Sequence, residues 1–387
     1  MKKIYQYLII ALFILTIFFA KSNISAFAEE SFTIKSKSAF QIEYNTGTVI
    51  YQKNQLQRLP IASMCKIMTQ LLCYEAIDNQ KISLDEMVTV SKNASSMGGS
   101  QVFLESDAQY SVDDLLKSIS IASANDACVA IAEHICGNTK DFVKLMNDRA
   151  NELGMDNTLF ANCTGLPAPE QYSCARDVAV MFKELLKHDE YFKYTTIWMD
   201  EIQHPNNRIT QITNTNKLIK FYNGCDSGKT GYTAEAGHCL CASAKRDNMR
   251  LITVVIGAPD SKRRFFEVSA LFDTAFANFC NKTILKAGQP LDESINVKKG
   301  KKESLSIEIA NDFNYFCNKN EKYTVETVFE KDKQVKAPIC QGDCVGNVTI
   351  YIDGVSIGKV DVVASETILS KTYYDSIKDI TNKWKLN

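Results

Sequence analysis

The stretch PIASMCKIMT, residues 60–69, places a serine and a lysine three positions apart where a loop enters an expected helix. This spacing puts Ser63 and Lys66 on one helical face, within reach of each other. The start of a helix also offers free backbone N–H groups, which favour negative charge near Ser63. Because a lysine with a lowered pKa can deprotonate a serine, the stretch predicts a nucleophile and its base.

Two short motifs further along the chain strengthen this interpretation. Ser123-Ala124-Asn125 lies between two expected helices, and Lys229-Thr230-Gly231 begins an expected strand. Each motif is common by chance when it stands alone, and so is Ser-x-x-Lys. Their order, with steps of 60 and then 106 residues, matches the three-motif set of penicillin-recognising serine enzymes.

Longer stretches extend the match. Residues 60–69, 96–137, 162–177 and 214–239 resemble the corresponding parts of D-alanyl-D-alanine carboxypeptidases, the low-molecular-mass penicillin-binding proteins. The resemblance covers essentially the whole chain. It implies an α/β (α+β) catalytic domain of the β-lactamase/transpeptidase type, with an antiparallel sheet flanked by helices, followed by a small all-β C-terminal domain.

The resemblance also implies a mechanism. Ser63 is expected to attack the carbonyl between the two terminal D-alanines of a peptidoglycan stem peptide, while Lys66 takes its proton. The acyl-enzyme is then hydrolysed by water, and β-lactams acylate the same serine. Ser123 would relay a proton to the leaving amine, and the backbone N–H groups of Ser63 and Tyr232 would form the oxyanion hole.

Four residues are expected to bind the substrate. By resemblance, Asn125 holds the substrate amide. A substrate that ends in a free carboxylate needs a fixed cation, which Lys229 supplies, and Thr230 can donate a second hydrogen bond. Gly231 is expected to let the strand backbone approach the substrate closely.

Two positions depart from the commonest family pattern. Cys65 stands where threonine is frequent, and Ala124 stands where glycine is frequent. Helical geometry points Cys65 away from the reactive face, so we expect it to be an inert packing residue, although a thiol beside a nucleophile could also react. Ala124 is expected to add a methyl group that narrows the substrate cleft.

The hydrophobic pattern predicts two folded domains. Strands at both ends of a largely helical region predict an α/β domain whose antiparallel sheet joins the two ends. Alternation between residues 295 and 369, broken by turn signals, predicts a small all-β domain without helices. The elements expected in the first domain are a hairpin over 39–51, helices over 112–119, 125–137, 173–187 and 261–279, and strands over 237–244 and 249–257.

These patterns predict four segments. Residues 1–28 read as a signal peptide, 29–285 as the serine carboxypeptidase domain, 288–370 as the all-β domain and 371–387 as an amphipathic helix. An uncleaved anchor at the N-terminus is the alternative, but its apolar core is shorter than the roughly 20 residues of a spanning helix. The exported enzyme is therefore expected at the outer face of the bacterial cytoplasmic membrane or in the cell wall space. The terminal helix either contacts the membrane peripherally or packs on the β domain.

Composition excludes several classes of function. The 387 residues carry 44 Lys plus Arg against 45 Asp plus Glu, so no basic field favours nucleic acid. The four histidines form no His-Glu-x-x-His pair, and the cysteine spacings lack the two close pairs of a structural zinc site. We therefore expect neither a metal nor another cofactor.

The 13 cysteines are an odd number for an exported chain. We expect most of them to be free, buried thiols that pack as small hydrophobic groups. Cys340 and Cys344 are plausible partners for a disulfide bond across a turn. Apolar helix or strand positions are occupied by Cys73, Cys128, Cys136 and Cys280.

Two rival functions stay open at this point. A β-lactamase-like hydrolase would need rapid deacylation, but we see no dedicated base for that step in the sequence. A non-catalytic scaffold that binds the cell wall would be expected to lose reactive residues, whereas the motif serines and lysines are intact.

Overall fold

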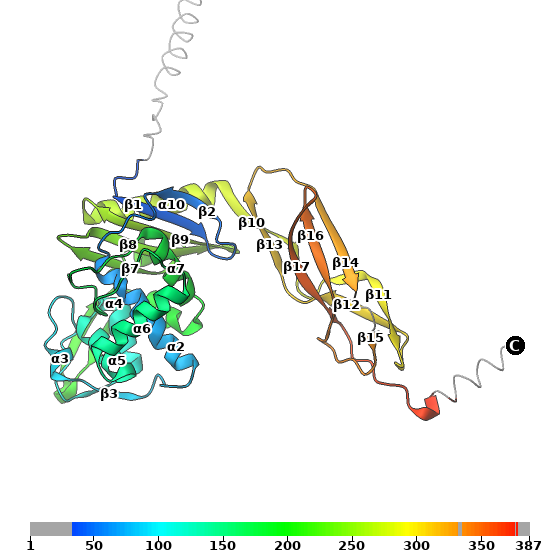
Figure 1. Ribbon diagram of the computed structural model, residues 1–387, viewed down its shortest axis with the longest axis horizontal. Coiled ribbons are helices and arrows are strands. Elements are labelled where there is room, and N and C mark those ends of the chain that lie inside the picture. The colour runs from blue at the N-terminus through cyan, green and yellow to red at the C-terminus, as the bar shows by residue number, and fades with distance from the viewer. Residues whose placement is uncertain (1–32, 332–334, 376, 378–387) are drawn as a thin grey trace, which may run out of the picture.

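The computed structural model describes residues 33–331, 335–375 and 377 of the chain, which form two lobes (Figure 1). The first lobe mixes helices and strands, and the second consists of strands. The predicted signal peptide, 1–28, and most of the predicted terminal helix, 371–387, lie outside the described residues. No helix in the described part of the chain combines the length and apolar character that crossing a membrane requires.

A five-stranded antiparallel sheet organises the first lobe, in the order β2-β1-β9-β8-β7. The N-terminal hairpin pairs with the last strand of the lobe, where Ala39 lies opposite Val255. The expected closure of the sheet by the two ends of the domain is therefore confirmed. The five strands are β1 (Ser38–Glu43), β2 (Val49–Lys53), β7 (Cys225–Thr233), β8 (Gly237–Arg246) and β9 (Met249–Ala258).

Helices cover both faces of this sheet (Figure 1). One face packs on the helical cluster built around Leu71, Leu116 and Phe182, and the other packs on α10 through Val268 and Phe272. The helical elements are η1 (Ala62–Cys65), α2 (Lys66–Asp78), α3 (Lys92–Ser95), α4 (Val112–Ala122), α5 (Asn125–Cys136), α6 (Thr139–Glu152), α7 (Ala175–Leu185), η2 (Asp189–Tyr191), α8 (Phe192–Thr195), η3 (Pro205–Asn207), α9 (Leu218–Phe221) and α10 (Ser261–Asn278).

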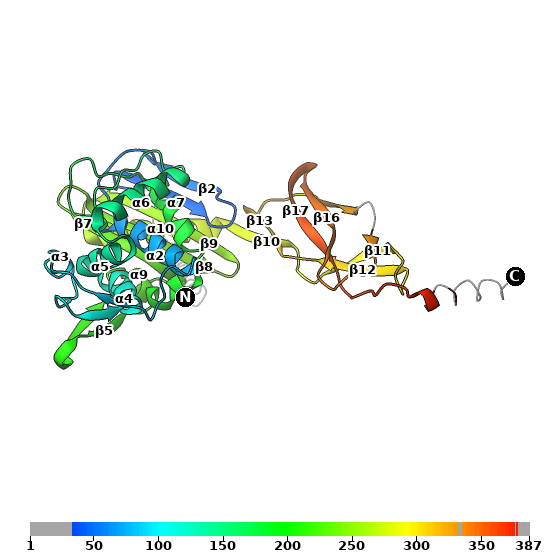
Figure 2. The same cartoon turned by 60° about the horizontal axis from the view of Figure 1, so that its bottom comes forward.

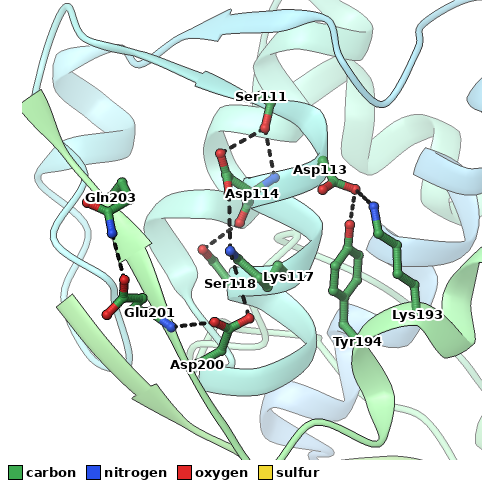
Figure 3. Close-up of polar contacts among 10 residues, drawn as sticks. All are labelled: Ser111, Asp113, Asp114, Lys117, Ser118, Lys193, Tyr194, Asp200, Glu201 and Gln203. Carbon is green, nitrogen blue, oxygen red and sulfur yellow. Dashed lines mark hydrogen bonds and ion pairs between the residues drawn. The ribbon is translucent and has the colours of Figure 1, made fainter. Parts of the chain in front are cut away.

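Helix α4 links the helical cluster to a hairpin that the sequence analysis did not include. Ser111 caps the helix by accepting a hydrogen bond from the Asp114 backbone N–H. On the polar side, the Lys117 ammonium lies 3.3 Å from Asp114 and 3.9 Å from Asp200 of the hairpin (Figure 3). The short strands of this lobe are β3 (Met87–Thr89), β4 (Gln109–Ser111), β5 (Met199–Gln203) and β6 (Ile209–Thr213).

The second lobe is all β in its described part, as predicted. A six-stranded sheet runs in the order β14-β16-β17-β12-β11-β15, and β10 pairs separately with β13. Residues 279–285 thus pair inside the second lobe, although the sequence interpretation ended the catalytic domain at residue 285. The strands are β10 (Phe279–Leu285), β11 (Pro290–Lys298), β12 (Ser304–Ile309), β13 (Phe313–Asn318), β14 (Val325–Lys331), β15 (Val335–Lys336), β16 (Cys344–Ile352) and β17 (Val355–Ala364).

All 13 cysteines lie in the described part of the chain, and all are free. Nine are buried, which confirms the expectation of free thiols packed in the interior. The bridge considered between Cys340 and Cys344 is wrong for this structure, because both thiols are exposed and unpaired. The Cys340 backbone N–H instead bonds the Asp343 carboxylate, and the Cys344 thiol donates to the Gly346 carbonyl.

Candidate active site

Ser63 and Lys66 lie where the short helix η1 runs into α2. The Lys66 Nζ is 2.9 Å from the Ser63 Oγ and 2.6 Å from the carbonyl oxygen of Thr164. Ala62, directly before the serine, has a φ of 47°, a conformation that residues with a side chain rarely adopt. The sharp entry into the helix positions the serine beside the lysine, as the three-residue spacing predicted.

The environment of Lys66 favours its neutral form. The side chain is fully buried, and burial lowers its pKa because the charged ammonium loses its hydration. The nearest ionisable neighbours include the Cys128 and Cys65 thiols, which oppose this shift. A neutral amine held 2.9 Å from a hydroxyl can accept its proton.

The second and third motifs meet through one hydrogen bond. Ser123 ends α4 in the left-handed conformation, with a φ of 62°, which turns its side chain out of the helix. The Lys229 Nζ donates to the Ser123 Oγ over 2.7 Å. Lys229 is only 1% exposed, and its pKa lies well below the ordinary value because of burial and, second, the charge of Lys66. Strand β7 thus brings a buried cation to the end of α4.

Asn125 begins α5 and closes the site from the helical side. Its backbone N–H bonds the Ser100 carbonyl, and its side-chain N–H bonds the Gly98 carbonyl over 2.6 Å. The buried side-chain oxygen has no donor among the described residues. Asp126 fixes the same loop by accepting from the backbone N–H of Leu104. The amide therefore has a fixed orientation and a free acceptor.

Gly231 lies against the backbone of the segment that carries Ser63. A Cβ at this position would lie 2.6 Å from the Ile61 carbonyl oxygen and 3.3 Å from the Ser63 nitrogen. On another side, a Cβ at Gly165 would lie 2.0 Å from the Ala62 carbonyl oxygen. Because Gly231 and Gly165 have no side chain, their backbone can lie directly against the segment that carries Ser63. The geometry therefore assigns Gly231 to positioning this segment.

Thr230 and Tyr232 lie on β7, the strand at one edge of the five-stranded sheet. The Thr230 hydroxyl bonds the Thr215 hydroxyl over 2.9 Å. Tyr232 is 60% exposed, and its ring stacks on His238 with the centroids 4.4 Å apart. Because β7 ends the sheet order, its outer edge carries backbone groups that no further strand of this sheet pairs. An extended peptide can add to such an edge by backbone hydrogen bonds.

Arg264 is a charged residue near the site that the sequence analysis missed. It is 9% exposed, and its Nη1 donates to the carbonyl oxygens of Gly231 and Cys239. Its buried Nε has no partner in the described structure, and burial lowers its pKa. One sequence signal could have revealed it: Arg264 shares the apolar stripe of α10 with Val268 and Leu271.

The two departures from the family pattern are both interior residues. Cys65 is fully buried, its thiol donates to the Asn162 carbonyl, and burial raises its pKa to about 12. The prediction of a packing residue is confirmed. Ala124 is also fully buried within the hydrophobic core, so its methyl group packs inward and does not narrow the cleft.

Known protein families match both lobes of the chain. The sequence profile of the D-alanyl-D-alanine carboxypeptidase family, Peptidase S11, matches residues 25–260, and that of the penicillin-binding protein 5 C-terminal domain matches 279–369. The D-alanyl-D-alanine carboxypeptidase DacF of Bacillus subtilis is 40% identical, over 99% of both chains. DacA of Haemophilus influenzae is 34% identical, over 85% of this chain and 84% of its own.

Solved structures are similar to both lobes together. The crystal structure of PBP3 from Streptococcus pneumoniae, a peptidoglycan synthesis regulatory factor, superposes with a TM-score of 0.73 at 28% identity, covering 87% of this chain and 100% of its own. Penicillin-binding protein 5 from Haemophilus influenzae gives 0.67 at 32% identity, covering 87% and 98%. The chain therefore belongs to the D-alanyl-D-alanine carboxypeptidase family of serine peptidases, as its three motifs predicted.

Proposed function

We propose that this enzyme removes the terminal D-alanine from peptidoglycan stem peptides that end in D-Ala-D-Ala, through an acyl-enzyme on Ser63. β-Lactams acylate the same serine and inhibit the enzyme. One observation carries the assignment of the nucleophile: the Ser63 Oγ lies 2.9 Å from the Nζ of a buried lysine with a lowered pKa. No cofactor is needed for this chemistry, because the amine itself accepts the proton.

In the acylation step, the Ser63 hydroxyl gives its proton to neutral Lys66 as its oxygen attacks the peptide carbonyl. The developing oxyanion accepts hydrogen bonds from the backbone N–H groups of Ser63 and Tyr232. Each donor of this kind contributes about 10²–10³-fold to the rate. The close approach of β7 to the nucleophile segment supports this pairing, because Gly231, the residue before Tyr232, lies against the backbone of Ser63.

Ser123 completes the proton path to the leaving group. Its hydroxyl accepts a hydrogen bond from Lys229 over 2.7 Å, which leaves its own proton free to pass to the nitrogen of the departing D-alanine, while the proton that Lys66 took from Ser63 is relayed to Ser123 in its place. When the tetrahedral intermediate collapses, the peptide C–N bond breaks and the amine leaves protonated. Water then attacks the ester on Ser63 and releases the shortened peptide.

Buried cations provide the substrate specificity. The terminal carboxylate of the substrate is bound by Lys229 and the hydroxyl of Thr230, and Arg264 reinforces the positive potential behind β7. Burial lowers the pKa of Lys229 in the empty site, and a bound carboxylate favours the charged form again. Asn125 presents its unpaired amide oxygen to the peptide N–H of the substrate.

The site of action follows from the predicted flanking segments. We propose that residues 1–28 direct export and are removed, and that the enzyme works at the outer face of the cytoplasmic membrane or in the cell wall space. The segment 371–387 then holds the enzyme peripherally at the membrane. Its described members Tyr373, Tyr374 and Ile377 are 84%, 74% and 44% exposed, which leaves them accessible to a lipid surface.

Release of D-alanine from a peptide ending in D-Ala-D-Ala tests the proposal directly. Ser63→Ala should abolish this release and the covalent labelling by a fluorescent penicillin. Ser356→Ala, a matched change on the exposed β16–β17 hairpin, should leave both unchanged. Release that survives Ser63→Ala would overturn the mechanism.

The same labelling separates the rival functions. A carboxypeptidase should hold the penicilloyl group long enough for it to be seen on a denaturing gel. Rapid loss of the label with turnover of the antibiotic would indicate a β-lactamase. A folded protein that takes up no label and releases no D-alanine would indicate a non-catalytic scaffold.

A further inference from the structure

Two cysteines face each other in the small sheet at the base of the second lobe. In the antiparallel pairing of β10 with β13, Cys280 lies directly opposite Cys317. Two residues further along this pairing, Lys319 lies opposite Asn278, and the Lys319 backbone N–H donates to the Asn278 carbonyl oxygen. Hydrogen-bonded pairs recur every second residue in such a ladder, so Cys280 and Cys317 form a hydrogen-bonded pair.

This arrangement suits a disulfide bond. The Cα atoms of a hydrogen-bonded antiparallel pair lie about 5.5 Å apart. Natural disulfides span about 4.4–6.8 Å between Cα atoms. Side chains directly opposite each other project from the same face of the sheet, so the thiols of Cys280 and Cys317 lie on one face of the β10–β13 pair. The Cα separation suits the bond, and the two Cβ atoms, up to about 5.5 Å apart in a regular pair of this kind, must approach to about 3.5–4.5 Å for the sulfur atoms to join.

The pair is also accessible on one side. Cys317 is 3% exposed, whereas Cys280 is half-buried and lines a cavity of about 250 Å³ between the lobes. Asn281, Phe276 and Lys319 line the same cavity. A small organic disulfide can therefore reach Cys280 first, with Cys317 placed behind it as the resolving thiol.

We propose that Cys280 and Cys317 are a disulfide-forming pair that a small organic disulfide oxidises in the folded, exported protein. The Cys280 thiolate attacks one sulfur of the oxidant, forming a mixed disulfide and releasing one thiolate. The Cys317 thiolate then attacks the Cys280 sulfur and releases the second thiolate. Two thiols lose two protons and two electrons, and the oxidant becomes two thiols.

The bond would act at the joint between the lobes. Strand β10 follows α10 without an intervening residue, and both views place β10 and β13 at the end of the second lobe that faces the first (Figures 1 and 2). The Lys319 ammonium on the β13 side donates to the Phe276 carbonyl, and the Asn281 amide donates to the Glu43 carboxylate. Joining Cys280 to Cys317 would fasten both strands to the catalytic lobe.

Peptide mapping tests the proposal. The reduced, folded chain is incubated with hydroxyethyl disulfide, quenched with N-ethylmaleimide, digested and analysed by mass spectrometry. We expect a peptide that links Cys280 to Cys317 to form before any other linked pair. Cys280→Ser should remove this product, and Cys340→Ser should retain it. Fluorescent penicillin labelling reports that each variant is folded, and it should be the same before and after oxidation.

Two results would overturn the proposal. The first is alkylation of both Cys280 and Cys317 after an exposure that oxidises Cys340 and Cys344. The second is a stable mixed disulfide on Cys280 with no linked peptide, because it would place Cys317 out of reach. Since the readout is a covalent map, neither result depends on carboxypeptidase activity.

Discussion

The two lobes differ in what they bury. In the described structure, the fully buried charged side chains all belong to the first lobe, among them Lys66, Asp126 and Lys229. The core of the second lobe is apolar, built from residues such as Leu305 and Ile350. Burying a charge costs stability unless it is paired. The buried charged groups therefore lower the stability of the first lobe, whereas the apolar core of the second lobe carries no such penalty.

The buried carboxylates and the buried cations of the first lobe also differ from each other. Asp126 accepts several backbone N–H groups, and Glu267 is paired with Arg263. By contrast, Lys66 and Lys229 have no carboxylate within ion-pair distance among the described residues, and their polar partners are hydroxyl and carbonyl oxygens. Buried amines without a carboxylate partner stabilise nothing by themselves, so they mark the functional centre.

The largest effect should come from removing one of these two buried lysines. Lys66→Met should lower the rate of acylation by penicillin by about 10²–10⁴-fold, the usual contribution of a general base. The melting temperature should stay the same or rise, because a buried amine without a carboxylate partner is replaced by an apolar side chain of similar length. Lys336→Met, on the exposed surface of the second lobe, should change neither quantity. A variant that retains full acylation would remove Lys66 from the mechanism.

Two glycine-to-alanine substitutions, one in each lobe, test the same steric change in both lobes. Gly231→Ala places a Cβ 2.6 Å from the Ile61 carbonyl oxygen, and Gly358→Ala places one 2.6 Å from the Phe313 ring. Displacement of the nucleophile segment should lower acylation about 10²-fold for Gly231→Ala, since misplacement by about 1 Å has this cost. Acylation by Gly358→Ala should equal that of the wild type. Equal rates for both variants would contradict the positioning role of Gly231.

The pH dependence of acylation should show both lysines. Burial lowers the pKa of Lys66 and of Lys229 from 10.5. The acylation rate should rise as Lys66 loses its proton, with a midpoint below 10.5 and about a tenfold change per pH unit below that midpoint. Loss of the Lys229 proton as the pH rises should raise the KM for the peptide. A rising limb centred at 10.5 or above would show that burial does not activate Lys66.

The smallest effect on catalysis should come from the second lobe. Leu305→Ala removes a fully buried side chain and should destabilise that lobe by about 2–5 kcal/mol. Acylation by penicillin should be unchanged, because Leu305 packs in a core separate from that of the first lobe. Leu71→Ala, a matched change in the helix that carries Lys66, should lower both stability and acylation. Loss of acylation in Leu305→Ala would show that the lobes are coupled.

Elements with a wide apolar face were predictable, and those with a narrow one were not. The strands β8 and β9 and the helices α4, α5, α7 and α10 were all expected from their patterns. Helix α6 was missed because its buried face is the narrow stripe of Phe142, Met146 and Ala150. The β5–β6 hairpin was missed because each strand buries one residue, Ile202 or Ile212. Tertiary contacts, and not hydrophobic patterns, stabilise these elements.

The sequence by itself determined the family and the closeness of Ser63 to Lys66, because the geometry of a single helical turn joins these two residues. Only the tertiary structure decided the contacts between distant segments. The register of β7 against its neighbours brings Lys229 to Ser123 across 106 residues, and the packing of α10 brings Arg264 to Gly231. Neither contact leaves a local pattern, because sheet register and helix packing depend on the whole core at once.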